Sequence, residues 1–95
     1  MIYLVVNLEE KGALINRLKR IEGQVKGIQK MIEEGKHCSD ILIQIAAAKS
    51  ALNAVGGLIL ENYMKDCLKS YLNGVAEEEA LDELVNIMVK YTRHN

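Results

Sequence analysis

Residues 38–72 read CSDILIQIAAAKSALNAVGGLILENYMKDCLKSYL, a stretch without proline whose apolar side chains occur nearly all round a helix. We predict one long helix over residues 38–71 that ends at Asn73-Gly74 and measures about 50 Å at 1.5 Å per residue. The alanines at 46–48 and the pair Gly56-Gly57 would let another backbone approach closely. A helix this long and this apolar is expected to pack against its copy in a second subunit.

A shorter helix is predicted on each side of the long one. Before it, apolar residues recur at spacings of three and four, which marks one face of a helix over residues 12–34 ending at Gly35. The members of this stripe are Leu14, Leu18, Ile21, Val25, Ile28 and Ile32. After it, Glu77, Glu78 and Glu79 lie where a helix N-terminus favours negative charge, so a third helix is expected over residues 76–92. Residues 1–10 are left as an N-terminal arm.

The expected fold is therefore all-α, a three-helix protomer with a long central helix in a single domain covering residues 1–95. Short connections favour antiparallel neighbours. The chain has 95 residues, is 49% hydrophobic and lacks Trp, Phe and Pro, which is typical of aliphatic helical bundles. A chain of this size cannot cover so much apolar surface alone, so subunit interfaces are expected.

Several classes of protein are disfavoured by the composition. We find no run of about 18 uncharged apolar residues, so no membrane span is expected. The N-terminal segment lacks the basic region of a signal peptide, and two cysteines without such a signal indicate the reducing cytoplasm. The sequence shows no Ser/His/Asp set, glycine-rich phosphate loop or paired carboxylates, so we predict that the protein is not an enzyme.

The two cysteines are the most informative residues of the long helix. Cys38 and Cys67 are 29 positions apart, which corresponds to about 43 Å along the axis and to within about 20° of whole turns. They share a face at opposite ends, so they cannot meet within one subunit. If two copies pack antiparallel, Cys38 of one lies beside Cys67 of the other, and symmetry makes the site twice. The face between them, here called the dimer seam, consists of Ile41, Leu42, Ile45, Lys49, Leu52, Gly56, Ile59, Leu60 and Tyr63.

A pair of thiols at such a junction has several possible uses. Two thiolates suit a soft ion such as Cu(I), or they can be oxidised together. Cys38 lies in the first helical turn, where the helix dipole favours thiolate. A closed zinc site usually needs four ligands, and none of the usual Cys/His spacings is present. His37 could be a third ligand or a capping or surface residue, Met64 could lend a thioether or fill the core, and each cysteine could simply be a small buried hydrophobe.

The first helix carries a basic face. Six basic residues and one acid lie between positions 11 and 30, a local excess of +5 in a chain of net charge −1. Gly23 and Gly27 lie on the same outer face, and each costs the helix about 1 kcal/mol relative to alanine. A phosphate backbone approaching the glycines would explain them, and an ordinary solvated face with tolerated glycines is the alternative. The basic residues of this helix are Arg17, Lys19, Arg20, Lys26 and Lys30, and those that we predict to bind DNA are Arg17, Lys19, Arg20 and Lys26.

Residues 14–62, with LINRLKRIEGQVKGIQ at their start and CSDILIQIAAAKSAL in their middle, followed by Cys67, resemble the CsoR/RcnR/FrmR/CstR family of bacterial repressors, and the resemblance begins at residue 12. The resemblance extends to about residue 90. It implies an antiparallel helical dimer that doubles into a flat homotetramer (a dimer of dimers). It also implies binding of double-stranded operator DNA, which is released when an effector fills a site between subunits. Basic positions that family members use or place near DNA match Arg17, Lys19, Arg20 and Lys49.

The effector is where this sequence departs from the copper-sensing pattern of that family. Copper-sensing members present a cysteine and then a histidine and a cysteine four apart, and here the histidine position is Tyr63. Nickel sensing would need more histidines and formaldehyde sensing a proline near the N-terminus, and neither is present. The pattern that remains resembles the persulfide-sensing branch, related to CstR. Our main hypothesis is thus a cytoplasmic repressor that senses a persulfide or polysulfide donor through Cys38, the attacking thiolate, and Cys67.

Two alternatives stay open. One is a Cu(I) sensor that uses the same bis-cysteine site, helped by His37 or Met64, and in this case Cu(I) is the effector. The other is a helical interaction module without effector chemistry. No cofactor is required in the main hypothesis or in the interaction module.

Overall fold

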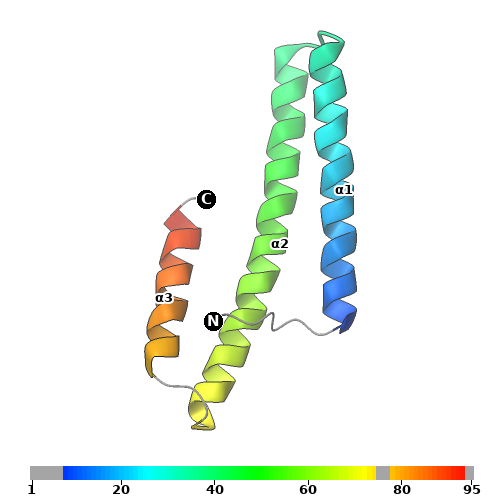
Figure 1. The fold of residues 1–95 in the computed structure, drawn as a ribbon. Helices are drawn as coiled ribbons and strands as arrows, with labels where there is room; N and C mark the ends of the chain where they lie inside the picture. The colour runs from blue at the N-terminus through cyan, green and yellow to red at the C-terminus, as the bar shows by residue number, and fades with distance from the viewer. Residues whose placement is uncertain (1–7, 75–77, 94–95) are drawn as a thin grey trace. The chain divides into compact units, whose positions relative to one another are not determined.

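The computed structural model describes residues 8–74 and 78–93, which form three α-helices with no strand among them (Figure 1). The helices are α1 (Leu8–Glu33), α2 (Cys38–Leu72) and α3 (Glu78–Arg93). The all-helical, three-helix protomer with a long central helix is thereby confirmed.

The start of α1 differs from the prediction. The helix begins at Leu8, four residues before the expected residue 12, so residues 8–10 of the supposed arm are helical. Two glutamates at positions 9 and 10 suit the positive end of the helix dipole, and Gly12 costs the helix only about 1 kcal/mol. Residues 1–7, the rest of the arm, lie outside the described residues.

Both predicted glycine stops are present. Gly35 has a φ of 68° and Gly74 a φ of 72°, in the left-handed region that favours glycine. After α1 the Gly35 N–H donates to the Ile32 carbonyl (3.1 Å) and the Lys36 N–H to the Met31 carbonyl (2.9 Å). These two bonds make a Schellman motif, which satisfies the last carbonyls of α1. The chain therefore turns within a few residues and starts α2 directly.

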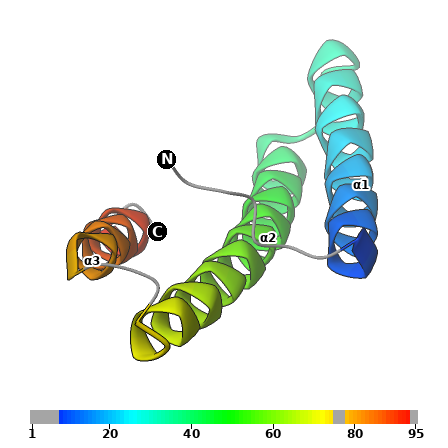
Figure 2. The ribbon, with the colours of Figure 1, turned by 60° about the horizontal axis from the view of Figure 1, so that its bottom comes forward.

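Residues Leu8–Gly56 form one compact unit, a hairpin in which α1 lies antiparallel to the first part of α2 (Figures 1 and 2). Its buried side chains are Leu14, Ile21, Ala48 and Val55. Only part of the predicted stripe of α1 is buried here, since Leu18, Val25 and Ile32 are 39%, 46% and 60% exposed. An apolar stripe that is 100° wide or more is too broad for one partner helix to cover.

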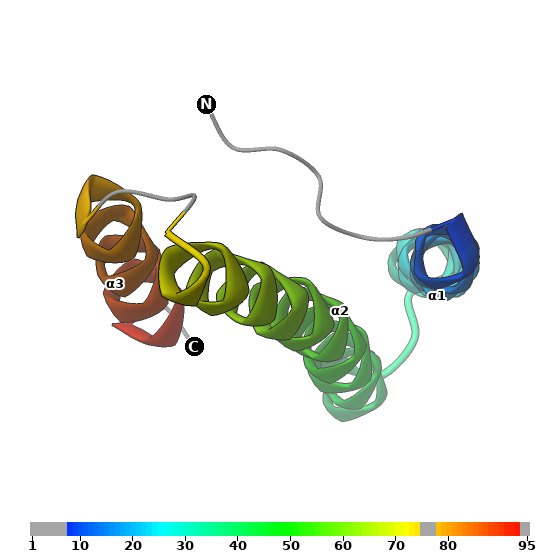
Figure 3. The ribbon, with the colours of Figure 1, turned by 90° about the horizontal axis from the view of Figure 1, so that it is seen from below.

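The second compact unit contains the part of α2 from Gly57 onward together with α3, which lie side by side in Figure 3. Cys67 of α2 is 7% exposed and Leu84 of α3 is 4% exposed, and they are the buried side chains among the described residues of this unit. Cys67 thus occupies the place of a core residue. This unit positions one of the two candidate sulfurs.

Most of α2 is uncovered within the chain. By length and composition alone, α2 could also cross a membrane, so the expectation that no segment could span a membrane is wrong by this measure. Only 6% of the apolar 18-residue stretch that meets the criterion is buried. Such a test is also passed by helices that pack in soluble proteins. Lys49 lies in the middle of the helix, where a charge in a bilayer is costly.

Candidate functional site

Cys67 is held against the start of α3. Its Sγ donates a hydrogen bond to the Ala80 carbonyl oxygen at 3.5 Å, a bond between residues 13 positions apart in the sequence. Ala80 belongs to the first turn of α3. The Cys67 thiol is therefore both a core group and a link between α2 and α3.

Tyr63 lies one helical turn before Cys67 and is half-buried. Burial, the Glu83 carboxylate and the Cys67 sulfur, in that order, raise the pKa of the Tyr63 phenol above 10.0. The phenol therefore keeps its proton at neutral pH. A neutral phenol can donate a hydrogen bond, but it is a poor ligand for a soft cation.

Cys38 is the first residue of α2 and is exposed. His37, just before it, caps the helix. The His37 carbonyl accepts the N–H groups of Asp40 (3.1 Å) and Ile41 (3.2 Å). The Nδ1 atom of the His37 ring accepts the Ser39 N–H at 3.2 Å and lies 2.8 Å from the Ser39 hydroxyl oxygen.

These contacts place the Nδ1 lone pair of His37 toward the Ser39 N–H, which it accepts. The hydrogen bonds agree with a capping residue, one of the alternatives drawn from the sequence, and they occupy the Nδ1 lone pair. As a metal ligand, His37 would have to give up this cap or use the opposite nitrogen.

The described part of the chain contains no cluster of three or more His, Cys, Asp or Glu side chains that could hold a metal. Both thiols are free, one exposed near the start of α2 and one buried near its end. Two thiolates nevertheless fit Cu(I), which accepts few soft ligands. A site made of both sulfurs requires a second subunit, and that pairing stays a prediction.

The predicted dimer seam is uncovered in the single chain. Among its members Leu42, Ile45, Leu52 and Ile59 are exposed, and so is Lys49. Exposed aliphatic side chains in a row are expected of a surface that another subunit covers. Ile41, Gly56, Leu60 and Tyr63 are half-buried within the chain.

The basic residues proposed for DNA are all exposed: Arg17, Lys19, Arg20, Lys26 and Lys49. Arg17 and Arg20 line a hollow of about 210 Å³ between α1 and α2, together with Ile21, Gln24 and Ala51. The sequence reasoning did not single out Gln24, although its spacing of four from Arg20 could have indicated it. At Gly23 and Gly27 an added Cβ would meet nothing within 4 Å, so the surface there is open.

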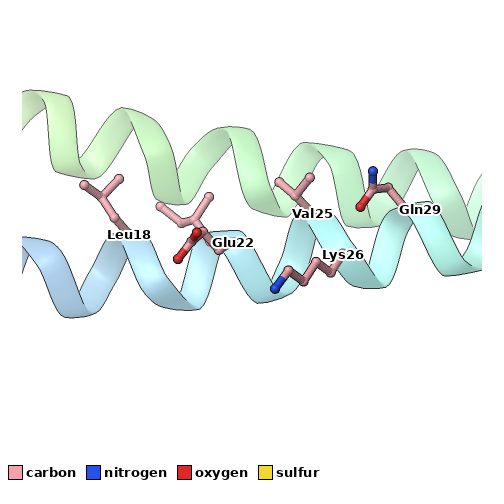
Figure 4. A pocket seen from close by; sticks show the side chains of 6 residues that line it. Leu18, Glu22, Val25, Lys26 and Gln29 are labelled. Carbon is pink, nitrogen blue, oxygen red and sulfur yellow. The ribbon is translucent and has the colours of Figure 1, made fainter.

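A larger groove of about 380 Å³ follows the exposed side of the apolar stripe of α1 (Figure 4). Leu18, Val25 and Gln29 point toward the α2 ribbon in this view, while Glu22 and Lys26 stay closer to the α1 ribbon. Glu22 and Gln29 were not among the predicted site residues. The groove shows that Lys26 borders apolar surface as well as solvent.

A family model described as a metal-sensitive transcriptional repressor matches residues 10–90. The chain belongs to this family. The resemblance inferred from the sequence is thereby confirmed for the family as a whole.

One relative and two solved structures that are similar to this chain support the same assignment. The chain is 41% identical over 85 residues to the copper-sensing transcriptional repressor CsoR of Bacillus subtilis, covering 90% of this chain and 84% of that protein. The crystal structure of the copper-sensing repressor CsoR with Cu(I) from Geobacillus thermodenitrificans superimposes with a TM-score of 0.83 at 40% identity, covering 97% of this chain and 94% of the other. The nickel-responsive transcriptional regulator InrS gives a TM-score of 0.78 at 33% identity, covering 96% and 99%.

These similarities bear on the effector. Two of the three proteins are described as copper-sensing and the third as nickel-responsive, and none as a sensor of reactive sulfur. The metal-sensing repressor family is established, and the comparisons favour the copper alternative over the persulfide hypothesis. Tyr63 remains the point at which this chain departs from the copper-sensing pattern that the resemblance implies.

Proposed function

We propose that this protein is a cytoplasmic, DNA-binding transcriptional repressor that senses Cu(I) through Cys38 of one subunit and Cys67 of its partner. Operator DNA is bound by the metal-free homotetramer and released when the thiols are metallated. The protein needs no resident cofactor and catalyses no reaction. Cu(I) supplies, when bound, a soft cation that ties two thiolates together.

The observation that carries the proposal is the donor set on α2. The helix presents one thiol near each end, and the described part of the chain contains no cluster of three or more His, Cys, Asp or Glu side chains. Two thiolates and no cluster of histidines or carboxylates suit Cu(I) better than nickel, cobalt or zinc. The similarity to copper-sensing repressors at 40% and 41% identity supports the same choice.

Each residue of the site has a separate role. Cys38 is exposed and is available to a partner without rearrangement. Cys67 is buried and donates to the Ala80 carbonyl, so metallation removes the proton of that hydrogen bond and changes the contact with α3. Tyr63 stays protonated and fills the space beside Cys67 without ligating.

The basic surface supplies the DNA-binding half of the function. One α1 helix with six exposed basic residues is a weak DNA binder, whereas four copies in one assembly neutralise many phosphates. Arg17 and Arg20 lie beside the hollow between α1 and α2, with Lys19 and Lys26 on the other side of the open glycine surface. Binding should therefore weaken strongly as salt is raised.

The test combines metal and DNA binding. Reduced protein is titrated with Cu(I) in the presence of a tight chelator, and its affinity for its own upstream DNA is measured with and without the metal. We expect about one Cu(I) per subunit and weaker DNA binding by the metallated protein. The variants Cys38→Ala and Cys67→Ala should lose the metal and stay on DNA. Failure of the wild-type protein to hold Cu(I) against the chelator would exclude the proposal.

A second candidate, sensing of reactive sulfur, is favoured by Tyr63, which offers no ligating nitrogen. The Cys38 thiolate would attack the terminal sulfur of an organic persulfide and expel its thiolate, leaving a persulfide on Cys38. The partner's thiolate at position 67 would then attack the inner sulfur of that group and expel hydrosulfide, giving an inter-subunit disulfide. The persulfide is the oxidant, and atoms and charge balance in both steps.

Mass spectrometry separates the two candidates. After treatment with an organic persulfide, the sulfur candidate requires dimers cross-linked between positions 38 and 67, together with loss of DNA binding. Unmodified monomers that still release DNA on addition of Cu(I) would leave copper sensing as the function.

A further inference from the structure

We propose that His37 is a positioning residue for the effector site: it caps α2 through Nδ1 and so fixes Cys38 in the helical register that the site needs. The inference rests on the proposed function and deepens it, because it gives His37 a role other than that of a third ligand. His37 lies between the end of α1 and the first residue of α2.

The geometry around His37 is that of a helix N-cap. An N-cap side chain accepts the N–H of the second or third helical residue, and the N-cap carbonyl accepts the first intrahelical bond. His37 does both, through Nδ1 to the Ser39 N–H at 3.2 Å and through its carbonyl to the Ile41 N–H at 3.2 Å. The Ser39 hydroxyl lies 2.8 Å from the same Nδ1 and supports the ring from the side.

Cys38 depends on this cap more than any other residue of α2 does. It is the first helical residue, so its side-chain direction is defined only while the first turn is formed. The two cysteines share a face of α2 only if that turn is helical, because each residue contributes about 100° of rotation. Gly35 and Lys36 already form the stop of α1, so the chain between the two helices offers few other groups to order the turn.

Helix ends open with free energies near zero, so removal of a cap changes the population of the first turn directly. Replacing a good N-cap residue by alanine typically lowers the ratio of ordered to open first turn by about fivefold. A site that requires the ordered turn then loses affinity in proportion to the fraction ordered. For His37→Ala we therefore expect Cu(I) affinity to fall about two- to fivefold.

The variants His37→Ala and His37→Asn test the inference, since asparagine is a favourable N-cap but has no imidazole. Three quantities are measured on the full, reduced chain: amide hydrogen exchange at residues 39–41, the rate of alkylation of Cys38 followed by peptide mass spectrometry, and Cu(I) affinity against a chelator. His37→Ala should change all three, and His37→Asn should restore each to within about twofold of wild type. Ser39→Ala keeps the backbone N–H that Nδ1 accepts and removes only the hydroxyl beside the ring, so it should change the three quantities less than His37→Ala does.

The opposite outcome is equally clear. If His37→Asn is as weak for Cu(I) as His37→Ala, and X-ray absorption shows a nitrogen ligand in the wild-type protein that both variants lack, His37 is a ligand and the inference fails. Hydrogen exchange and alkylation are measured without metal, so they test the capping role independently of whether the protein binds Cu(I). A wild-type protein that binds no Cu(I) would refute copper sensing, while unchanged exchange and alkylation in His37→Ala would refute the capping role.

Discussion

The double variant Gly23→Ala, Gly27→Ala should make the protein more stable and a weaker DNA binder. Both glycines lie inside α1, where each costs about 1 kcal/mol relative to alanine. An added Cβ would meet nothing within 4 Å at either position, so no clash within the chain offsets the gain. The free energy of unfolding should therefore rise by about 2 kcal/mol.

The effect on DNA has the opposite sign. Gly23 and Gly27 are four residues apart on one face of α1, with Arg20 on one side and Lys19 and Lys26 on the other. If the basic face lies against phosphates, two added methyl groups hold the helix away from them. Over-packing costs about 1 kcal/mol or more for each methyl group, so the two together should lower the affinity for operator DNA by about thirtyfold.

The assay pairs thermal unfolding with DNA titration at a fixed protein concentration, because the melting temperature of an oligomer depends on concentration. Gly12→Ala is the matched control: it lies in the same helix, also meets nothing within 4 Å, and is about 16 Å from Gly23 along the axis. It should add stability and leave DNA binding unchanged. Tighter or equal DNA binding by the double variant would refute the reasoning and leave the glycines as tolerated residues on a solvated face.

Four other variants probe the basic face, the core and the phenol. Arg20→Ala should weaken DNA binding and reduce the slope of log affinity against log salt by about 0.9 for each phosphate that is no longer neutralised, with Cu(I) affinity unchanged in the chelator assay. Leu84→Ala removes a side chain that is 4% exposed and should lower stability by about 2–5 kcal/mol in denaturant unfolding. The pKa of the Tyr63 phenol is higher in the folded state than in the unfolded state, so its contribution to stability is complete below pH 10.0. This contribution is lost as the pH rises through the pKa of the folded state. Ultraviolet titration, with Tyr63→Phe subtracted, should place ionisation above pH 10.0, and Glu83→Gln should lower it without abolishing the shift.

The sequence predicts the helices and their ends well because these depend on local rules. Gly35 and Gly74 end α1 and α2 in left-handed conformations, as their positions after apolar periodic segments indicate. The start of α1 is missed although nothing in residues 8–11 breaks a helix, because the apolar stripe used to place it begins only at Leu14. A single glycine costs too little to end a helix whose apolar face is packed.

The site is less predictable, because its contacts join distant residues. The hydrogen bond from Cys67 to the Ala80 carbonyl depends on how α3 packs on α2, which no periodicity specifies. The raised pKa of Tyr63 depends in part on Glu83 of α3 in the same way. From the sequence, His37 could be a ligand, a capping residue or a surface residue, and only the position of its ring indicates the cap.

The apolar surface left open by the single chain links the fold to the proposed mechanism. Leu18 and Val25 of α1 and Leu42 and Leu52 of α2 are exposed, although they belong to the stripes that the sequence pattern assigns to packing. A chain of 95 residues with this much uncovered apolar surface gains stability from a second copy. The thiols of one chain lie at opposite ends of α2, so under the proposed function a second copy that covers the exposed side chains of α2 would also supply the second sulfur. Metal binding and subunit association are then the same equilibrium, and dilution that separates the subunits should abolish both together.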